Sequence, residues 1–269
     1  MIRTILSLLG MLLLWFGTVP AILAQEIPIL ITQEQLEWGE GITKKAFEAT
    51  KKEDFIQAEA YWTQLIEKFP RNSAVWSNRG NIRVSQNQLD KAIADFNKAV
   101  ELTPNEPALY LNRGTALEGQ GKYQEAIINY NRVLEITPND AMAYNNRGNA
   151  QGGLGSWEQA LKDYQTAVKI DPDFTFAKAN VTLALYQLGN KKEALKQMKN
   201  IVRKYPMFPD TRAALTAILW ELGKQGEAES NWVATVGMDN RYQDLNWVIK
   251  VRRWPPRMIT ALDKFLNLK

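Results

Sequence analysis

The sequence contains no cysteine and no histidine. Without cysteine the chain can form neither a disulfide nor a zinc–thiolate site, and it has no thiol nucleophile. Without histidine it lacks the commonest general base and the most frequent transition-metal ligand. We therefore expect no metal, no cofactor and no catalytic site. An enzyme would need an acid–base pair such as Glu118 near Lys122, and catalytic residue types are not clustered in the sequence.

The sequence also lacks a large excess of positive or negative charge. The chain has 33 basic and 29 acidic residues, which gives a formal net charge of +4 in 269 residues. Most of these charges alternate in sign along helical segments, whereas nucleic-acid-binding proteins gather Lys and Arg on one face. Nucleic acid is therefore not an expected partner. Hydrophobic residues make up 45% of the chain, which is enough for a sizeable core.

Residues 1–24 have the layout of a secretory signal. A single basic residue, Arg3, precedes a long apolar run, and small residues follow up to Ala24, where cleavage would release an exported protein. The alternative is an uncleaved membrane anchor, because residues 4–24 are 21 consecutive uncharged positions, long enough to span a bilayer. Residues 25–38 show no strong helical period and are predicted to be a linker.

An internal period of 34 residues organises the rest of the chain. The period is marked by five prolines: Pro70, Pro104, Pro138, Pro172 and Pro206. Each unit also carries an alanine and a large apolar residue at fixed offsets, for example Ala126 and Tyr130. Small residues let two antiparallel helices approach closely, while the large side chain fills the space between them. Since proline lacks the amide donor that continues a helix, the pattern predicts repeated helix-turn-helix units.

Glycines occur at two places in these units. The first set separates the two helices of a unit: Gly121, Gly155, Gly189 and Gly223. The second set lies where the first helix should have its last turn: Gly119, Gly152 and Gly153. Each of the latter would cost a helix about 1 kcal/mol relative to alanine. We interpret them as early helix ends or as places where a ligand backbone approaches closely.

This pattern resembles the tetratricopeptide repeat family, most strongly from about Ser73 to Pro172, where Trp76, Gly80 and Phe96 stand at the family's positions. The resemblance implies an all-α fold, a right-handed α-solenoid of about six helix-turn-helix units with C-terminal capping helices. The units would be 39–72, 73–106, 107–140, 141–174, 175–208 and 209–242. Decay of the pattern in the first and sixth units is expected at solenoid ends.

One departure from the family pattern recurs three times. Arg79, Arg113 and Arg147 replace the apolar residue expected before a glycine. They could form a ladder of anion-binding sites. We favour a structural role, in which each arginine lays its stem along the next unit and pairs its head with a neighbouring acid.

Residues 243–269 are predicted to be capping helices that cover the last apolar face. A helix is expected from Tyr242 to Val251, and an amphipathic one follows the prolines at 255 and 256. The Arg-Trp-Pro-Pro element at 253–256 resembles one found in cyanobacterial and plastid thylakoid-lumen repeat proteins. A basic surface at this end could instead contact an anionic membrane: Lys250, Arg252, Arg253 and Arg257.

The resemblance also implies that the first helix of each unit lines a concave groove where partners bind. The inward positions of units two to four are rich in asparagine: Asn78, Asn81, Asn112, Asn145, Asn146 and Asn149. Side-chain amides both donate and accept hydrogen bonds, so they suit a peptide backbone, although simple solvation of the groove explains them as well. Units five and six are expected to add Phe176, Tyr186 and Trp220 as an aromatic part of the groove.

The sequence thus predicts a non-catalytic protein–protein interaction scaffold or assembly factor of an extracytoplasmic compartment, the periplasm or a thylakoid lumen. It would bind peptide segments or helices of other proteins in the concave groove. The alternative is a membrane-tethered envelope or thylakoid adaptor whose N-terminal anchor is not cleaved. Fold alone does not choose between the two.

Overall fold

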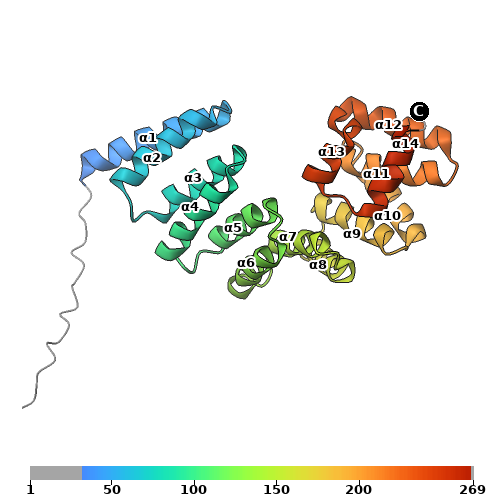
Figure 1. Cartoon of the computed structure of the whole chain (residues 1–269), viewed down its shortest axis with the longest axis horizontal. Coiled ribbons are helices and arrows are strands. Elements are labelled where there is room, and N and C mark those ends of the chain that lie inside the picture. Colours follow the sequence, from blue (N-terminus) through green and yellow to red (C-terminus); the bar gives the residue numbers. More distant parts are fainter. Residues whose placement is uncertain (1–31, 268–269) are drawn as a thin grey trace, which may run out of the picture.

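The computed structural model describes residues 32–267, in which helices follow one another in an open arc (Figure 1). Helices α1–α4 form one arm of the arc and α9–α14 the other, with α5–α8 between them. The predicted signal at 1–24 lies outside the described residues. Within 32–267, no helix combines the length and the apolar character that crossing a bilayer requires.

Twelve helices form six antiparallel pairs in chain order. Their bounds are α1 Gln33–Lys51, α2 Phe55–Lys68, α3 Ser73–Ser85, α4 Leu89–Leu102, α5 Pro107–Gly119, α6 Tyr123–Ile136, α7 Ala141–Gly153, α8 Trp157–Ile170, α9 Thr175–Gln187, α10 Lys191–Lys204, α11 Pro209–Glu221 and α12 Gln225–Met238. Odd-numbered members are called A helices and even-numbered ones B helices. Successive A helices contact one another at α3–α5, α5–α7 and α9–α11, as expected for the inner wall of a curved stack.

Glycine and an aromatic ring bring the two helices of a pair together. A Cβ atom at Gly114 would lie 2.6 Å from the ring of Tyr130, and one at Gly148 would lie 2.6 Å from Tyr164. Both tyrosines are buried. The small residue on the A helix therefore makes room for the large residue on the B helix, as the period predicts. The residue between the helices has a left-handed backbone, for example Gly155 at φ 79°, where the lack of a Cβ removes the steric cost.

The first helix starts earlier than the sequence pattern suggests. The predicted linker at 25–38 is wrong in its last part, because α1 begins at Gln33. Thr32 accepts a hydrogen bond from the backbone of Gln35, whose side chain bonds back to the Thr32 amide. This capping box is a local helix-start signal that the search for a 34-residue period overlooks.

The A helices also do not end early at their late glycines. Helix α5 ends at Gly119 and α7 at Gly153, and both have 13 residues, as α3, α9 and α11 do. A Cβ atom at Gly153 would lie 2.5 Å from the ring of Tyr123, a residue of the preceding B helix. Close packing of the Tyr123 ring, rather than an early helix end or the approach of a ligand backbone, explains Gly153.

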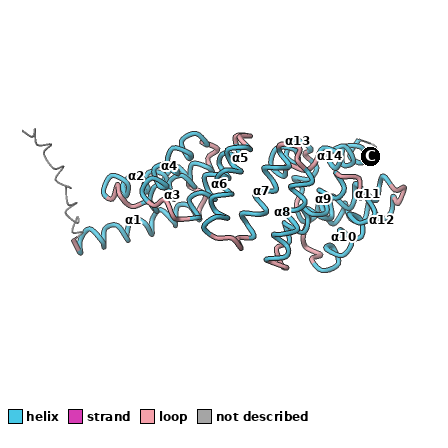
Figure 2. The backbone as a smooth tube through the Cα atoms, turned by 90° about the horizontal axis from the view of Figure 1, so that it is seen from below, coloured by secondary structure: helices cyan, strands magenta, loops and turns pink. Residues whose placement is uncertain are grey.

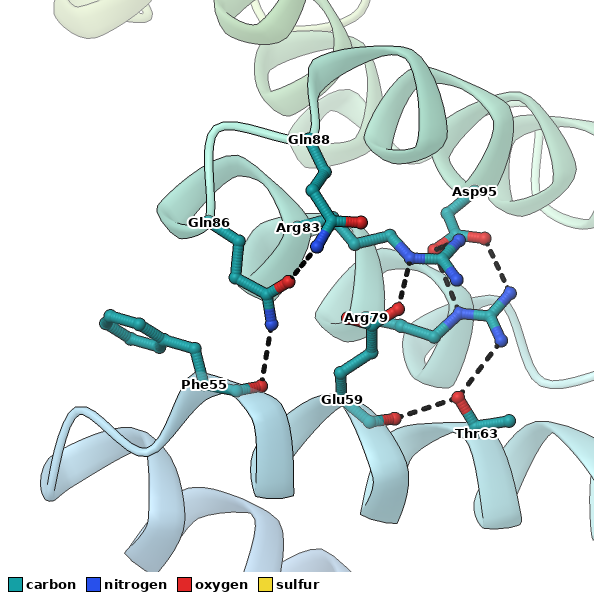
Figure 3. Close-up of polar contacts among 8 residues, drawn as sticks. All are labelled: Phe55, Glu59, Thr63, Arg79, Arg83, Gln86, Gln88 and Asp95. Atoms are coloured by element: carbon teal, nitrogen blue, oxygen red, sulfur yellow. Dashed lines mark hydrogen bonds and ion pairs between the residues drawn. The ribbon is translucent and has the colours of Figure 1, made fainter.

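The recurring arginines are structural. Arg79 donates two hydrogen bonds to Asp95 on its own B helix, at 3.0 and 2.7 Å, and a third at 3.2 Å to Thr63 on the preceding one. Arg83 shares Asp95 and also binds Glu59 at 2.9 Å (Figure 3). The guanidinium thus joins its own unit to the preceding unit, not to the next one. Arg147 repeats the arrangement with Asp163 and Asn131, 68 residues later.

Unit three departs from this arrangement, because Arg113 binds two amide oxygens instead of a carboxylate. Its partners are Asn129 at 2.7 Å and Asn97 at 2.9 Å. Burial lowers the pKa of Arg113, whereas hydrogen bonding to Asp163 raises the pKa of Arg147. The expected pairing with an acid therefore holds in units two and four and fails in unit three.

Unit three shows how a neutral asparagine binds the recurring arginine, and this arrangement can be introduced into unit four. Asp163→Asn in unit four would reproduce the unit-three arrangement, since asparagine is already accommodated at the equivalent position. A neutral acceptor binds a guanidinium more weakly than a carboxylate, so we expect the free energy of unfolding to fall by about 1–2 kcal/mol. Urea unfolding followed by circular dichroism measures it. An unchanged midpoint would show that the ion pair adds nothing beyond the neutral bond.

Residues 240–267, which follow α12 and which we call the C-terminal segment, do not form a seventh repeat unit. The helix predicted from Tyr242 to Val251 is broken into a 3₁₀ turn (Asn240–Gln243), the short α13 (Leu245–Trp247) and a π-helical turn (Val248–Arg252). Helix α14, Pro256–Asn267, then packs on the A helices α11 and α9. Figures 1 and 2 place α14 beside them in both views. It therefore covers the inner wall of units five and six instead of stacking on α12 alone.

Candidate functional site

The inner wall of units five and six is filled by the chain itself. Met258, Ala261, Leu262 and Phe265 of α14 are fully buried and belong to one hydrophobic cluster with residues of α9 and α11. The ring of Phe265 contacts Trp220 with centroids 5.3 Å apart. The apolar stripe on α14 packs against the apolar wall of α9 and α11, and this contact removes both surfaces from water.

The predicted aromatic part of the groove is therefore wrong for two of its three residues. Tyr186 is buried, and its hydroxyl donates a hydrogen bond to Glu221. Trp220 is half-buried against α14. Phe176 alone remains exposed, stacked edge-on against Phe208. A partner cannot reach the Tyr186 ring, and α14 covers one side of the Trp220 ring.

A cleft remains open next to this filled region. It has a volume of about 460 Å³ and lies between unit four, α9 and the C-terminal segment. Its lining includes three of the predicted asparagines, namely Asn145, Asn146 and Asn149. We call it the asparagine cleft. The predicted Asn78, Asn81 and Asn112 are not part of it.

A fourth asparagine, which sequence reasoning missed, completes the floor of the asparagine cleft. Asn180 donates hydrogen bonds from Nδ2 to Oδ1 of Asn145 at 2.9 Å and of Asn149 at 3.2 Å. Asn145 in turn donates to Asn146 at 3.2 Å, and Tyr164 donates to Asn149 at 3.1 Å. The period itself contained the signal, because Asn180 stands 34 residues after Asn146.

The walls of the asparagine cleft are apolar. Met142 on α7, Phe176 on α9, and Ile249 and Val251 of the C-terminal segment all belong to the lining, and all four are exposed. Amides at the floor and exposed apolar side chains at the rim form the kind of mixed surface that binds an organic ligand or a peptide.

The basic surface predicted at the C-terminal end is broken up by internal ion pairs. Arg252 binds Asp210 at 2.7 Å and lies over the Phe176 ring, and Arg253 binds Glu118. Burial lowers the pKa of Arg252, but the charge of Asp210 and the hydrogen bonding to Asp210 and Tyr242 together raise it by more, so the net pKa is above the usual range. Lys250 and Arg257 are exposed. The four residues therefore do not form one cationic patch for a membrane.

Two acids hold the C-terminal segment in place. Asp210, buried in the first turn of α11, accepts hydrogen bonds on Oδ1 from Tyr242 at 2.7 Å, from Arg252 at 2.7 Å and from Trp254 at 3.2 Å. Glu118 on α5 is the second acid. Sequence analysis paired Glu118 with Lys122, whereas the structure pairs it with Arg253, 135 residues away.

Glu118 is buried at one edge of the asparagine cleft. Its Oε2 accepts a hydrogen bond from the Tyr130 hydroxyl at 2.9 Å, and its Oε1 accepts one from Arg253. Burial raises the pKa of Glu118, and Arg253 and Tyr130 oppose this shift. No group of three or more acidic residues able to hold a metal ion occurs in the described part of the chain.

Comparisons with known proteins agree with the helix-pair architecture. Family models described as TPR repeat or tetratricopeptide repeat match residues 80–121 and 119–155, 141–174, and 182–206. The prediction of an all-α solenoid of tetratricopeptide units is thereby confirmed. A comparison with curated proteins gave no match.

Several solved structures share the fold. MamA is 23% identical with a TM-score of 0.55, over 62% of this chain and 92% of that one. A tetratricopeptide repeat protein from Parabacteroides merdae is 18% identical with a TM-score of 0.65, over 86% and 93%. YrrB, a TPR protein with an unusual peptide-binding site, is 20% identical with a TM-score of 0.51, over 76% and 97%. At such identities the likeness concerns the fold.

Proposed function

We propose that this chain, in which residues 80–174 and 182–206 match tetratricopeptide repeat models, is a non-catalytic scaffold that binds an extended segment of another protein in the asparagine cleft. The observation that carries this proposal is the cleft itself, with amides at its floor and exposed apolar side chains at its rim. YrrB, which shares the fold, is described as having a peptide-binding site.

The hydrogen-bonding groups at the floor match a peptide backbone. Within residues 32–267, the Nδ2 groups of Asn146 and Asn149 and the Oδ1 of Asn180 hold no hydrogen bond to the protein, whereas the opposite ends of these amides do. A peptide group offers one acceptor and one donor, so an extended segment can satisfy both kinds of group. The network among the asparagines fixes their orientation before the partner arrives, which reduces the entropy lost on binding.

The apolar rim supports an uncharged, partly apolar partner segment. Met142 and Phe176 are 52% and 47% exposed, and Ile249 and Val251 of the C-terminal segment are 44% and 58% exposed. Burying such side chains against a partner is favourable because apolar surface leaves water. Specificity would then come from side chains of the partner that enter between the two walls.

Asn146→Ala is expected to weaken binding of the partner segment by about tenfold, the equivalent of one hydrogen bond. Asn78→Ala is the matched control, because Asn78 holds the same repeat position two units earlier and lies outside the asparagine cleft. Isothermal titration with the partner recovered by affinity purification measures both affinities. Equal losses in the two variants, or no loss in either, would remove the cleft as the binding site.

The compartment is a further part of the proposal. The layout of residues 1–24 supports an exported scaffold or assembly factor, acting on other exported proteins in a periplasm or thylakoid lumen. The 21 uncharged positions at 4–24 support the second candidate, a membrane-tethered adaptor. The intact mass of the natively expressed protein separates them: loss of 24 residues supports the exported form, and a full-length mass supports the tethered one.

A further inference from the structure

The two acids that hold the C-terminal segment differ in how firmly they do so. Asp210 receives three donors, and both it and Trp254 are buried. Glu118 receives one arginine, Arg253, whose side chain is 38% exposed. The Asp210 contact therefore fixes the segment, while the Arg253 side chain can leave Glu118 without unpacking anything else.

Arg253 also adopts an unusual backbone conformation. Its φ and ψ are 51° and 46°, the left-handed region that residues with a Cβ seldom occupy. Such conformations persist where surrounding contacts impose them and are frequent at ligand-binding and switching sites. Here the fixed Arg252 and Trp254 on either side and the bond to Glu118 impose it.

The charged form of Glu118 depends on a nearby cation. Its side chain is 7% exposed, and a buried carboxylate without an opposite charge is strongly unfavourable. Within the described residues the ion pair to Arg253 is its one salt bridge. A ligand that displaces Arg253 and leaves Glu118 charged must therefore bring a positive charge of its own.

We propose that Glu118 recognises an Arg or Lys side chain of the segment bound in the asparagine cleft, and that Arg253 occupies this position only until the partner arrives. Glu118 and the asparagines line the same cleft, so one extended segment can contact both. The inference rests on the proposed function and adds the chemical class of the ligand: an apolar segment with one basic residue. Arg253 acts as an intramolecular competitor, so it lowers the affinity for segments that carry that residue.

Two peptides test the charge requirement. The probes are a blocked pentapeptide with the sequence Ile-Val-Arg-Val-Ile and the same peptide with citrulline, an uncharged isostere, in place of arginine. The chain variant is Arg253→Gly, because glycine adopts the left-handed backbone without steric cost and empties the site. We expect this variant to bind the arginine peptide about tenfold or more tightly than the citrulline peptide, the difference between a charged and a neutral hydrogen bond. Adding Glu118→Gln should abolish the preference.

A second measurement needs no peptide. Millimolar n-propylguanidinium chloride should raise the Tm of Arg253→Gly by more than sodium chloride at equal ionic strength, and should not do so for the natural chain or for the double variant. If Arg253→Gly does not fold, the natural chain should still prefer the arginine peptide, by a smaller factor, and Glu118→Gln should remove that preference.

The outcomes separate this inference from the proposed function. Equal binding of both peptides would overturn the role of Glu118 and leave the asparagine cleft as a peptide site. Failure of both peptides to bind, together with no guanidinium effect, would overturn both proposals.

Discussion

Asp210→Ala is expected to lower the free energy of unfolding by about 3–5 kcal/mol, the usual cost of removing one partner of a buried ion pair. The substitution leaves Arg252 half-buried without its carboxylate and removes the acceptor of Tyr242 and Trp254. The C-terminal segment should then detach from α11, and Trp254 should become exposed. Urea unfolding gives the stability, and a red shift of tryptophan emission gives the exposure.

Asp173→Ala is the matched control for this variant. Asp173 also binds a cation, Lys204 at 2.9 Å, but its side chain is 80% exposed. Ion pairs at the surface contribute little to stability, so a small loss is expected. If the two variants lose similar stability, Asp210 does not anchor the C-terminal segment.

Phe265→Ala is expected to destabilise the protein by about 3–5 kcal/mol, because it removes a fully buried aromatic ring and leaves a cavity. The ring contacts Trp220 and Trp232 at centroid distances of 5.3 and 5.1 Å. Loss of this contact should loosen α14 from the inner wall of units five and six and increase binding of a hydrophobic dye such as ANS. Chemical denaturation and dye fluorescence measure the two effects.

Phe47→Ala provides the comparison, because Phe47 is 55% exposed although its ring also contacts a tryptophan, Trp62 at 5.3 Å. We expect it to cost about 1 kcal/mol, as for an aromatic pair with little burial. A loss at Phe265 no larger than the loss at Phe47 would mean that α14 contributes little to the core.

The repeat architecture could be predicted because its cause is local and recurs. Gly114 is needed where the Tyr130 ring crosses the A helix, and Gly148 is needed where Tyr164 does. Units two to four meet the same steric requirement, so glycine recurs every 34 positions in them and the period is visible in the sequence. Asn180 could have been predicted in the same way, because it stands 34 residues after Asn146.

The position of α14 could not be predicted in this way. An apolar stripe through Met258, Leu262 and Phe265 shows that one face of the helix is buried, but not which apolar surface covers it. Both the end of the solenoid and the inner wall of α9 and α11 offer apolar surface. The pair Glu118–Arg253 was equally hidden, because its members are 135 residues apart and follow no repeat.

The features that the sequence did not predict, α14 and the Glu118–Arg253 pair, determine the shape of the candidate site. The sequence-based groove was continuous from unit two to unit six, with Tyr186 and Trp220 open to a partner. In the structure the chain itself buries Tyr186 and covers part of Trp220, and the asparagine cleft is bordered by its own Ile249 and Val251. The C-terminal segment thus restricts where a partner can bind and contributes one wall of the binding cleft.

Site-specific photo-crosslinking tests this account most directly. A benzoylphenylalanine replaces Met142, which is 52% exposed in the asparagine cleft, or Val233, which is 70% exposed on α12. The account predicts that the partner protein is crosslinked at position 142, through an extended segment containing a basic residue, and not at position 233. Crosslinking at 233 with none at 142 would contradict it.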